Sequence, residues 1–358
     1  MTLTFDHVTL GQRVLFGTGK SAKNLASEVA RLGARRVMVI ASDRETPVAR
    51  TVAAEIEVAL WYHDVVMHVP IEVAEKARAA AAEAGVDLLV CIGGGSTTGL
   101  AKAIAMTSRL PIVAVPTTYA GSEATNVWGL TEASRKTTGV DDAVLPVGVI
   151  YDAALTLSLP VALSVASGLN GMAHCIDSMW APRADPINAA LGAEGIRALS
   201  RGLPLITEDL AGTEGREQAL YGAYLSAVAF ASAGSGLHHK ICHVLGGTFN
   251  LPHAQTHATV LPYVLAFNAP YAPDAAARIA AAFGSTDALT GLQELRKRLD
   301  APTALADYGF TAEGIAEAVA VILPAAPASN PHPVTTENLT RLLRAALTGE
   351  DPSALLDL

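Results

Sequence analysis

The sequence predicts two domains: an N-terminal α/β domain built on a doubly wound parallel sheet, and an all-α C-terminal domain. The chain has 358 residues, which matches two domains of roughly 100–200 residues each. Its first half alternates short runs of β-branched residues with Ala-rich amphipathic stretches, a pattern typical of parallel strands joined by helices. Beyond about residue 160 long stretches rich in Ala and Leu replace the strand signal.

The strands expected in the first half are near-continuous apolar runs, as in a sheet that helices cover on both faces. A first helix is expected at 21–32, where Gly33 follows it. Strands are predicted at 36–41, 65–69, 87–92 and 110–115, with a further helix over 100–107.

The second half is predicted to be helical throughout. Helices are expected at 161–180, 187–207, 213–231, 237–245, 254–267, 273–283, 287–299 and 311–321. The Pro- and Ala-rich stretch 324–333 is expected to be a loop. We place the boundary near Leu159-Pro160, which gives an α/β domain at 1–159 and a helical domain at 160–358.

Composition excludes several classes of protein. Hydrophobic residues make up 51% and charged residues 16%, so the chain can bury a core and is not mainly disordered. The net charge of -9, without a dense basic run, argues against a nucleic-acid partner. We expect a cytoplasmic protein, because the N-terminus lacks a secretory pattern and the uncharged stretch 153–169 is too short to span a membrane. The three cysteines have no CxxC spacing and are interpreted as buried thiols.

A glycine-rich loop follows the strand predicted at 87–92. In Gly93-Gly94-Gly95-Ser96 the glycines allow the backbone to approach a pyrophosphate, and the N–H groups at the following helix start can hold the anion. Leu100 and Thr98 exclude a P-loop and a complete GxGxxG motif, respectively, so a plain strand–helix turn is the alternative. The next strand ends in a second polar loop, 116–123, and two such loops at one sheet edge favour nucleotide binding.

Five of the ten histidines lie between residues 238 and 257. His239 and His243 are four residues apart and share a helix face, while Gly246-Gly247 is expected to end that helix. His253, after Pro252 in the return loop, is expected to converge on His239.

Upstream, Asn170 and His174 share the same four-residue spacing. Three imidazoles from two helices and a loop suit Zn²⁺ or Fe²⁺, and the alternative is a set of core or capping histidines. We favour an active site for this cluster, and the presence of a metal in it is a separate question. His238 and His257 are expected to support the site from behind or to lie at the surface.

Together, in this order along most of the chain, these motifs resemble the iron-containing alcohol dehydrogenase family. The resemblance implies an N-terminal Rossmann-like domain that binds NAD(P), a helical domain of the dehydroquinate synthase-like fold, an active site in the cleft between them, and a homodimer. Three positions depart from the family pattern. Asn170 replaces a metal-binding Asp, Gly99 replaces an Asp of the phosphate loop, and Ser42 stands where a carboxylate often grips the ribose of NAD.

One branch of the family shares Asn170, the short length and the sequence His238-His239-Lys240. Resemblance to it implies metal-independent reduction of the carbon–carbon double bond of maleylacetate, a dianion, to 3-oxoadipate in the degradation of aromatic compounds. Either NADH or NADPH is expected as reductant, because Ser42 would not repel a 2′-phosphate. The alternatives are a metal-dependent alcohol or polyol dehydrogenase, a non-catalytic nucleotide-binding protein, and a lyase similar to dehydroquinate synthase.

The resemblance also implies residue roles. His243 would be the general acid. His174, His239 and His253 would donate hydrogen bonds to the reacting oxygen instead of binding a metal. Lys240 is a candidate for a substrate carboxylate, and a solvated charge is its alternative interpretation. The expected catalytic set is Asn170, His174, His239, Lys240, His243 and His253. The expected cofactor set is Ser42, Gly94, Gly95, Ser96, Thr97, Thr117, Thr118, Ser122 and Lys136.

Overall fold

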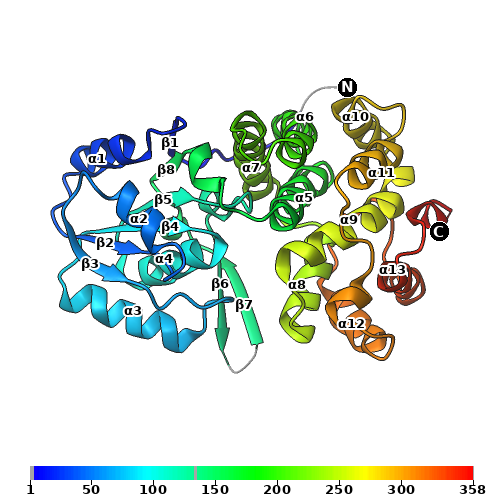
Figure 1. Cartoon of the computed structure of the whole chain (residues 1–358). Helices are drawn as coiled ribbons and strands as arrows, with labels where there is room; N and C mark the ends of the chain where they lie inside the picture. The colour runs from blue at the N-terminus through cyan, green and yellow to red at the C-terminus, as the bar shows by residue number, and fades with distance from the viewer. Residues whose placement is uncertain (1–3, 133–134, 358) are drawn as a thin grey trace. The chain divides into compact units, whose positions relative to one another are not determined.

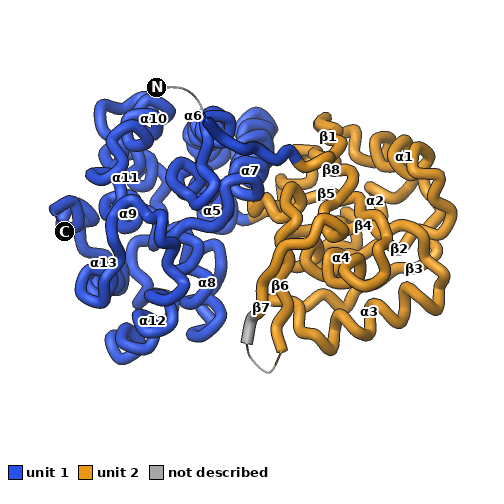
Figure 2. The backbone as a smooth tube through the Cα atoms, turned by 180° about the vertical axis from the view of Figure 1, so that it is seen from behind, with its two compact units in different colours: residues 1–9, 160–358 blue, residues 10–159 orange. Residues whose placement is uncertain are grey.

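The computed structural model describes residues 4–132 and 135–357, without the side chains of Arg135 and Lys136. The chain forms two compact units, coloured separately in Figure 2. One is an α/β unit, Leu10–Leu159, and the other is a helical unit, Pro160–Leu358, which also includes the N-terminal segment up to Thr9. In that segment His7 Nδ1 lies 2.8 Å from Asp185 Oδ2, so the first residues belong with the helices and not with the sheet.

A six-stranded sheet forms the centre of the α/β unit (Figure 1). Its paired strands are all parallel, and their order is β1-β8-β5-β4-β2-β3. The strands are β1 (Arg13–Phe16), β2 (Val37–Ile40), β3 (Val58–Tyr62), β4 (Leu88–Gly93), β5 (Ile112–Pro116) and β8 (Gly148–Tyr151). The predicted doubly wound parallel sheet is confirmed.

Helices cover both faces of this sheet. They are α1 (Ser21–Leu32), α2 (Thr46–Val52), α3 (Ile71–Glu83) and α4 (Gly95–Ser108). Side chains alternate along β4, so Val90 belongs to the core formed with α1 and α2, whereas Leu89 and Cys91 belong to the core formed with α3 and α4. Burial on both faces explains why these strands read as continuous apolar runs.

One predicted strand in this unit is wrong, and several strands were not predicted. The strand expected at 65–69 is wrong: the third strand is β3, and His68 and Val69 have φ angles of 65° and 49°, which an extended strand excludes. An antiparallel hairpin of β6 (Val127–Glu132) and β7 (Arg135–Val140) lies where no strand was expected.

The second unit is helical, as predicted. Its long helices are α5 (Val161–Ser178), α6 (Pro186–Glu208), α7 (Glu214–Ala233), α8 (Leu237–Phe249), α9 (His253–Asn268), α10 (Pro273–Phe283), α11 (Ala288–Arg298), α12 (Gly314–Ile322) and α13 (Thr336–Thr348). Helix α5 is buried from Ser164 to its end and packs against α6, α7 and α9. Within the described residues, no helix has the length and apolarity needed to cross a membrane.

Helix α8 differs from its prediction at its C-terminal end. It runs through Gly246-Gly247 to Phe249 and ends where Asn250 adopts a left-handed φ of 55°. Pro252 then caps α9, so His253 is the first residue of a helix and not part of a loop. The sequence also gave no signal that we interpreted as α13, which a Thr335–Asn338 capping box begins.

Candidate active site

Strands β4 and β5 bring the two expected nucleotide loops to one edge of the sheet. The strands are neighbours with Gly93 paired to Pro116, so the residues that follow them lie side by side. A Cβ placed on Gly94 would lie 3.1 Å from Thr118 Cγ2, and one on Gly95 would lie 3.9 Å from Ser122 Oγ. The structure therefore brings the expected pyrophosphate loop and the second loop into contact.

Glu45, which the sequence analysis did not select, joins these loops. Its carboxylate accepts hydrogen bonds from the Gly94 N–H at 3.2 Å and from the Ser42 hydroxyl at 2.8 Å. The hydroxyls of Thr97 and Thr117 also donate to it, at 3.3 and 3.2 Å. Its position three residues after Ser42, in the turn that follows β2, was the available signal.

Lys102 on α4 holds the second loop in place. Its buried ammonium donates to the carbonyl oxygens of Ser122, Thr125 and Val127 at 2.7–2.8 Å, and to Thr125 Oγ1 at 3.0 Å. Burial lowers the pKa of Lys102 to about 7, and the nearby Glu123 carboxylate opposes that shift. These contacts fix the backbone of the loop beside the glycine turn.

A dinucleotide fits these loops. Ser122 Oγ is a buried hydroxyl oxygen with no hydrogen-bond partner among the described residues, as expected of a group that serves a ligand. The backbone of Gly94, Gly95 and Ser96 starts helix α4, where N–H groups can hold a pyrophosphate. Lys136 lies on β7, and its side chain is outside the described residues.

In the helical unit, α5 places three polar side chains on one face. Asn170, His174 and Asp177 follow at intervals of four and three residues, and all are buried. Asp177 was missed, although it follows His174 by three residues and therefore lies on the same helix face. Its carboxylate accepts from the Gly236 N–H at 2.9 Å, at the start of α8.

Asp177 also orients His239. The distance from Asp177 Oδ2 to His239 Nδ1 is 2.8 Å, and both side chains are fully buried. The His239 ring stacks on the His174 ring at 4.8 Å, and Phe230 lies against both rings. The structure therefore brings His174 and His239, two of the expected catalytic residues, into contact.

His238 and His257 are not surface residues, which corrects that part of the sequence interpretation. Their nitrogens Nε2 and Nδ1 form a 2.9 Å hydrogen bond, and both side chains are almost completely buried. Cys242 Sγ lies 3.6 Å from His238 Nε2, so this thiol also belongs to the cluster. His238 and Cys242 lie one turn apart on α8, and His257 faces them from α9.

The remaining candidates are more exposed than the buried histidines His174, His238, His239 and His257. The His243 ring lies 6.1 Å from that of His239, and the half-buried His243 is more accessible than His239. His253 is exposed, and its ring lies 4.4 Å from that of His257. Lys240 is half-buried on α8, and the described ring contacts and hydrogen bonds of the cluster do not include it.

Burial shifts the pKa values of the histidines and of the aspartate in this cluster. It lowers the pKa of His174 to about 4 and of His238 to about 3, and it holds the pKa values of His239 and His257 well below their ordinary range. Burial raises the pKa of Asp177 to about 7, against backbone N–H donors that favour its charged form. At neutral pH the four imidazoles are neutral, and the carboxyl group is poised to exchange a proton.

Three orphaned atoms bear on whether the residues fit a metal. Asn170 Oδ1, His174 Nδ1 and His239 Nε2 are buried without hydrogen-bond partners among the described residues. Nitrogen donors of this kind bind Zn²⁺ or Fe²⁺, but the oxygen donor is a neutral amide. The Asp177 carboxylate accepts hydrogen bonds from His239 and Gly236 through Oδ2, and its Oδ1 has no partner among the described residues. The donor set lacks the negative charge that tight binding of iron favours, so it fits that metal poorly.

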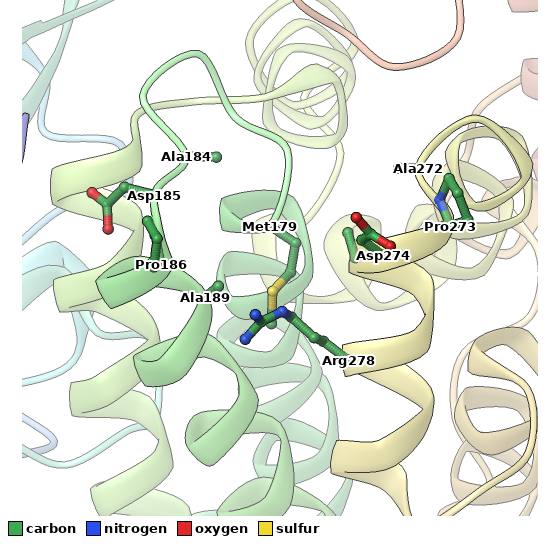
Figure 3. Close-up of a pocket in the computed structure, with 10 residues that line it drawn as sticks. Met179, Ala184, Asp185, Pro186, Ala189, Ala272, Pro273, Asp274 and Arg278 are labelled. Atoms are coloured by element: carbon green, nitrogen blue, oxygen red, sulfur yellow. The ribbon is translucent and has the colours of Figure 1, made fainter. Parts of the chain in front are cut away.

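A separate cavity of about 380 Å³ opens in the helical unit (Figure 3). It is lined by Met179, by the start of α6 around Pro186, and by the start of α10, from which Arg278 extends. Asp185 at its rim already caps α6 and pairs with His7. None of the residues expected to be catalytic lines this cavity, and we assign it no role.

Comparison with known proteins extends these observations. Residues 11–153 match the family model described as iron-containing alcohol dehydrogenase, and residues 164–347 match its C-terminal counterpart. The chain is 45% identical to a maleylacetate reductase of Sphingobium indicum, over 98% of this chain and 99% of the relative.

Two solved structures are similar throughout. An iron-containing alcohol dehydrogenase of Corynebacterium glutamicum has 70% sequence identity and a TM-score of 0.98, covering 99% of this chain and 100% of its own. A maleylacetate reductase of Agrobacterium tumefaciens has 39% identity and a TM-score of 0.92, covering 97% of this chain and 99% of its own.

Proposed function

Because the chain belongs to the iron-containing alcohol dehydrogenase family, we propose that it reduces the carbon–carbon double bond of maleylacetate to give 3-oxoadipate. It is an NAD(P)H-dependent oxidoreductase of that family. The observation that carries the proposal is the 45% identity, over 98% of the chain, to a relative named maleylacetate reductase. The neutral donor set around Asn170 is consistent with it.

The chemistry of this substrate defines what the site must do. Maleylacetate is a dianion whose double bond is conjugated to a ketone, so hydride addition at the β-carbon leaves negative charge on the ketone oxygen. The bound dinucleotide supplies the hydride. The protein must stabilise the enolate oxygen and then protonate the α-carbon.

The Asp177–His239 pair can stabilise the enolate. When the pair holds one added proton, either as imidazolium and carboxylate or as neutral imidazole and carboxylic acid, His239 carries a hydrogen on Nε2. That nitrogen has no other partner among the described residues, so its N–H is available to an oxyanion. The raised pKa of Asp177, about 7, makes the added proton accessible near neutral pH.

His243 is proposed to deliver the proton to the α-carbon. It lies one helical turn after His239 on α8, and its half-buried ring can reach both the reaction site and solvent. His174, stacked on His239, keeps that ring in its orientation and shields it from water. His253 is proposed as a further donor at the start of α9, and Lys240 as a partner for a substrate carboxylate.

We propose that the reaction needs no metal. A conjugated enolate spreads its charge over several atoms, so neutral or protonated imidazoles suffice where a simple ketone would need a Lewis acid. Asn170 supports this proposal, because an amide at this position removes a negative charge from the donor set. A place in the degradation of aromatic compounds, a cytoplasmic location and a homodimeric state stay predictions.

A second candidate is a metal-dependent alcohol dehydrogenase. The observation that favours it is the hydrogen bond from His239 Nδ1 to Asp177, because metal-binding histidines commonly donate their second nitrogen to a carboxylate. The name of the Corynebacterium glutamicum relative points the same way.

The test is the oxidation of NADH and of NADPH with maleylacetate, by protein stripped with a chelator and then resupplied with Zn²⁺ or Fe²⁺. We expect turnover by the stripped protein, unchanged by metal and reduced about 100-fold or more in His243→Ala, since general acids contribute roughly 10²–10⁴-fold. Turnover that appears only with metal would select the alcohol dehydrogenase. No turnover under either condition would reject maleylacetate as the substrate.

A further inference from the structure

The carboxylate of Glu45 lies among the groups expected to bind the dinucleotide. Four members of the expected cofactor set donate hydrogen bonds to it: Ser42, Gly94, Thr97 and Thr117. Ser42, Gly94 and Thr117 follow β2, β4 and β5, three strands that are neighbours in the sheet, and Thr97 lies in the first turn of α4. The carboxylate therefore occupies the carboxyl edge of the sheet, where ligands of open α/β sheets bind.

This carboxylate has no cationic partner among the described residues. Its hydrogen-bond donors are one backbone N–H and three hydroxyls, and no ion pair in the described part of the chain includes Glu45. Neutral donors hold the side chain in position but do not cancel its field. An anionic group of a ligand placed beside it would be repelled.

The glycine turn is shaped around this side chain. Gly93 has a φ of 154°, and a Cβ at this position would lie 2.6 Å from Glu45 Oε2 and 2.5 Å from Thr97 Oγ1. Only glycine leaves room there for the carboxylate. Gly95 remains exposed and Ser96 half-buried, so the start of α4 is still accessible to a pyrophosphate.

We propose that Glu45 makes this enzyme select NADH over NADPH. A carboxylate at the ends of these strands accepts hydrogen bonds from the ribose hydroxyls of NADH and repels the 2′-phosphate of NADPH. Ser42 donates its hydroxyl to Glu45, so it orients a carboxylate and does not leave the position neutral. The inference rests on the proposed use of a nicotinamide dinucleotide, and it replaces the expectation that both forms are accepted.

The test compares dissociation constants of NADH and NADPH, measured by fluorescence titration without substrate, in native protein, Glu45→Gln and Asp43→Asn. Glu45→Gln removes the charge but keeps the shape of the side chain. Asp43→Asn removes a charge from an exposed residue of the same turn. We expect native protein to prefer NADH by about tenfold or more, Glu45→Gln to lose about tenfold of that preference, which corresponds to about 1.4 kcal/mol, and Asp43→Asn to keep it.

Four outcomes would overturn the proposal. An unchanged ratio in Glu45→Gln would show that the carboxylate does not face the 2′ position. Equal tightening of both dinucleotides would show that it only competes with the pyrophosphate, and an equal effect of Asp43→Asn would show a general field. If native protein binds neither dinucleotide, the proposed function itself fails, and the inference fails with it.

Discussion

Asn170 determines the charge of the polar centre in the helical unit. It is buried on α5 with its Oδ1 unpartnered, one turn before His174. Asn170 stands where the family resemblance implies a metal-binding Asp, and the Asp177 carboxylate on the same helix accepts hydrogen bonds from His239 and Gly236 through Oδ2. With Asp at position 170 the donor atoms would suit a metal ion, whereas with Asn they suit hydrogen bonding.

Replacing Asn170 with Asp is expected to create a metal-dependent fold stability. Without metal, a buried and unpaired carboxylate should lower the free energy of unfolding by at least about 2 kcal/mol. Zn²⁺ should then raise the melting temperature of Asn170→Asp more than that of native protein, as followed by calorimetry. The Asn170→Ala variant is the control, and an equal response to Zn²⁺ in all three proteins would contradict the expectation.

Helices α6 and α7 pack closely because small residues lie between them. Gly202 on α6 lies so close to α7 that a Cβ would sit 2.6 Å from the Gly215 carbonyl oxygen and 2.8 Å from the Ala219 nitrogen. These are backbone atoms, so they cannot move aside as the end of a flexible side chain can. The close approach of the two helices therefore requires glycine at this position.

The Gly202→Ala variant is expected to be less stable by about 1–2 kcal/mol. Overpacking costs roughly 1–3 kcal/mol, and the better helix propensity of Ala returns at most about 1 kcal/mol. Urea unfolding measures the difference. Gly11→Ala is the matched control, because a Cβ at Gly11 meets no atom within 4 Å. Equal stability of both variants would show that the helices separate at little cost.

Stability of the whole molecule should depend on pH through its buried histidines. Burial lowers the pKa of His174 to about 4 and of His238 to about 3, and it holds those of His239 and His257 well below their ordinary range. Unfolded histidines take up protons near 6.5, so below that pH the unfolded state binds more protons and folding becomes less favourable. Asp177, whose pKa is raised to about 7, acts in the opposite direction, but it is one group against four.

Between pH 7 and 5.5 we expect the free energy of unfolding to fall by about 2–4 kcal/mol, since each group contributes up to about 1.4 kcal/mol per pH unit. Denaturant titration at the two pH values measures this. The Asp177→Asn variant lacks the opposing group, so its loss over the same range should be larger. A native protein as stable at pH 5.5 as at pH 7 would refute the burial of neutral imidazoles.

The sequence by itself determined the two-part α/β and helical architecture, because apolar periodicity reflects which faces are buried. It also determined the position of the glycine loop and the placement of Asn170 and His174 on one helix face, because these depend on local spacing. Only the tertiary structure brought Glu45 to the glycine loop, Asp177 to His239 and His238 to His257. Those contacts join residues 19 to 62 positions apart. They depend on the order of the strands and on the packing of the helices, which local sequence patterns do not specify.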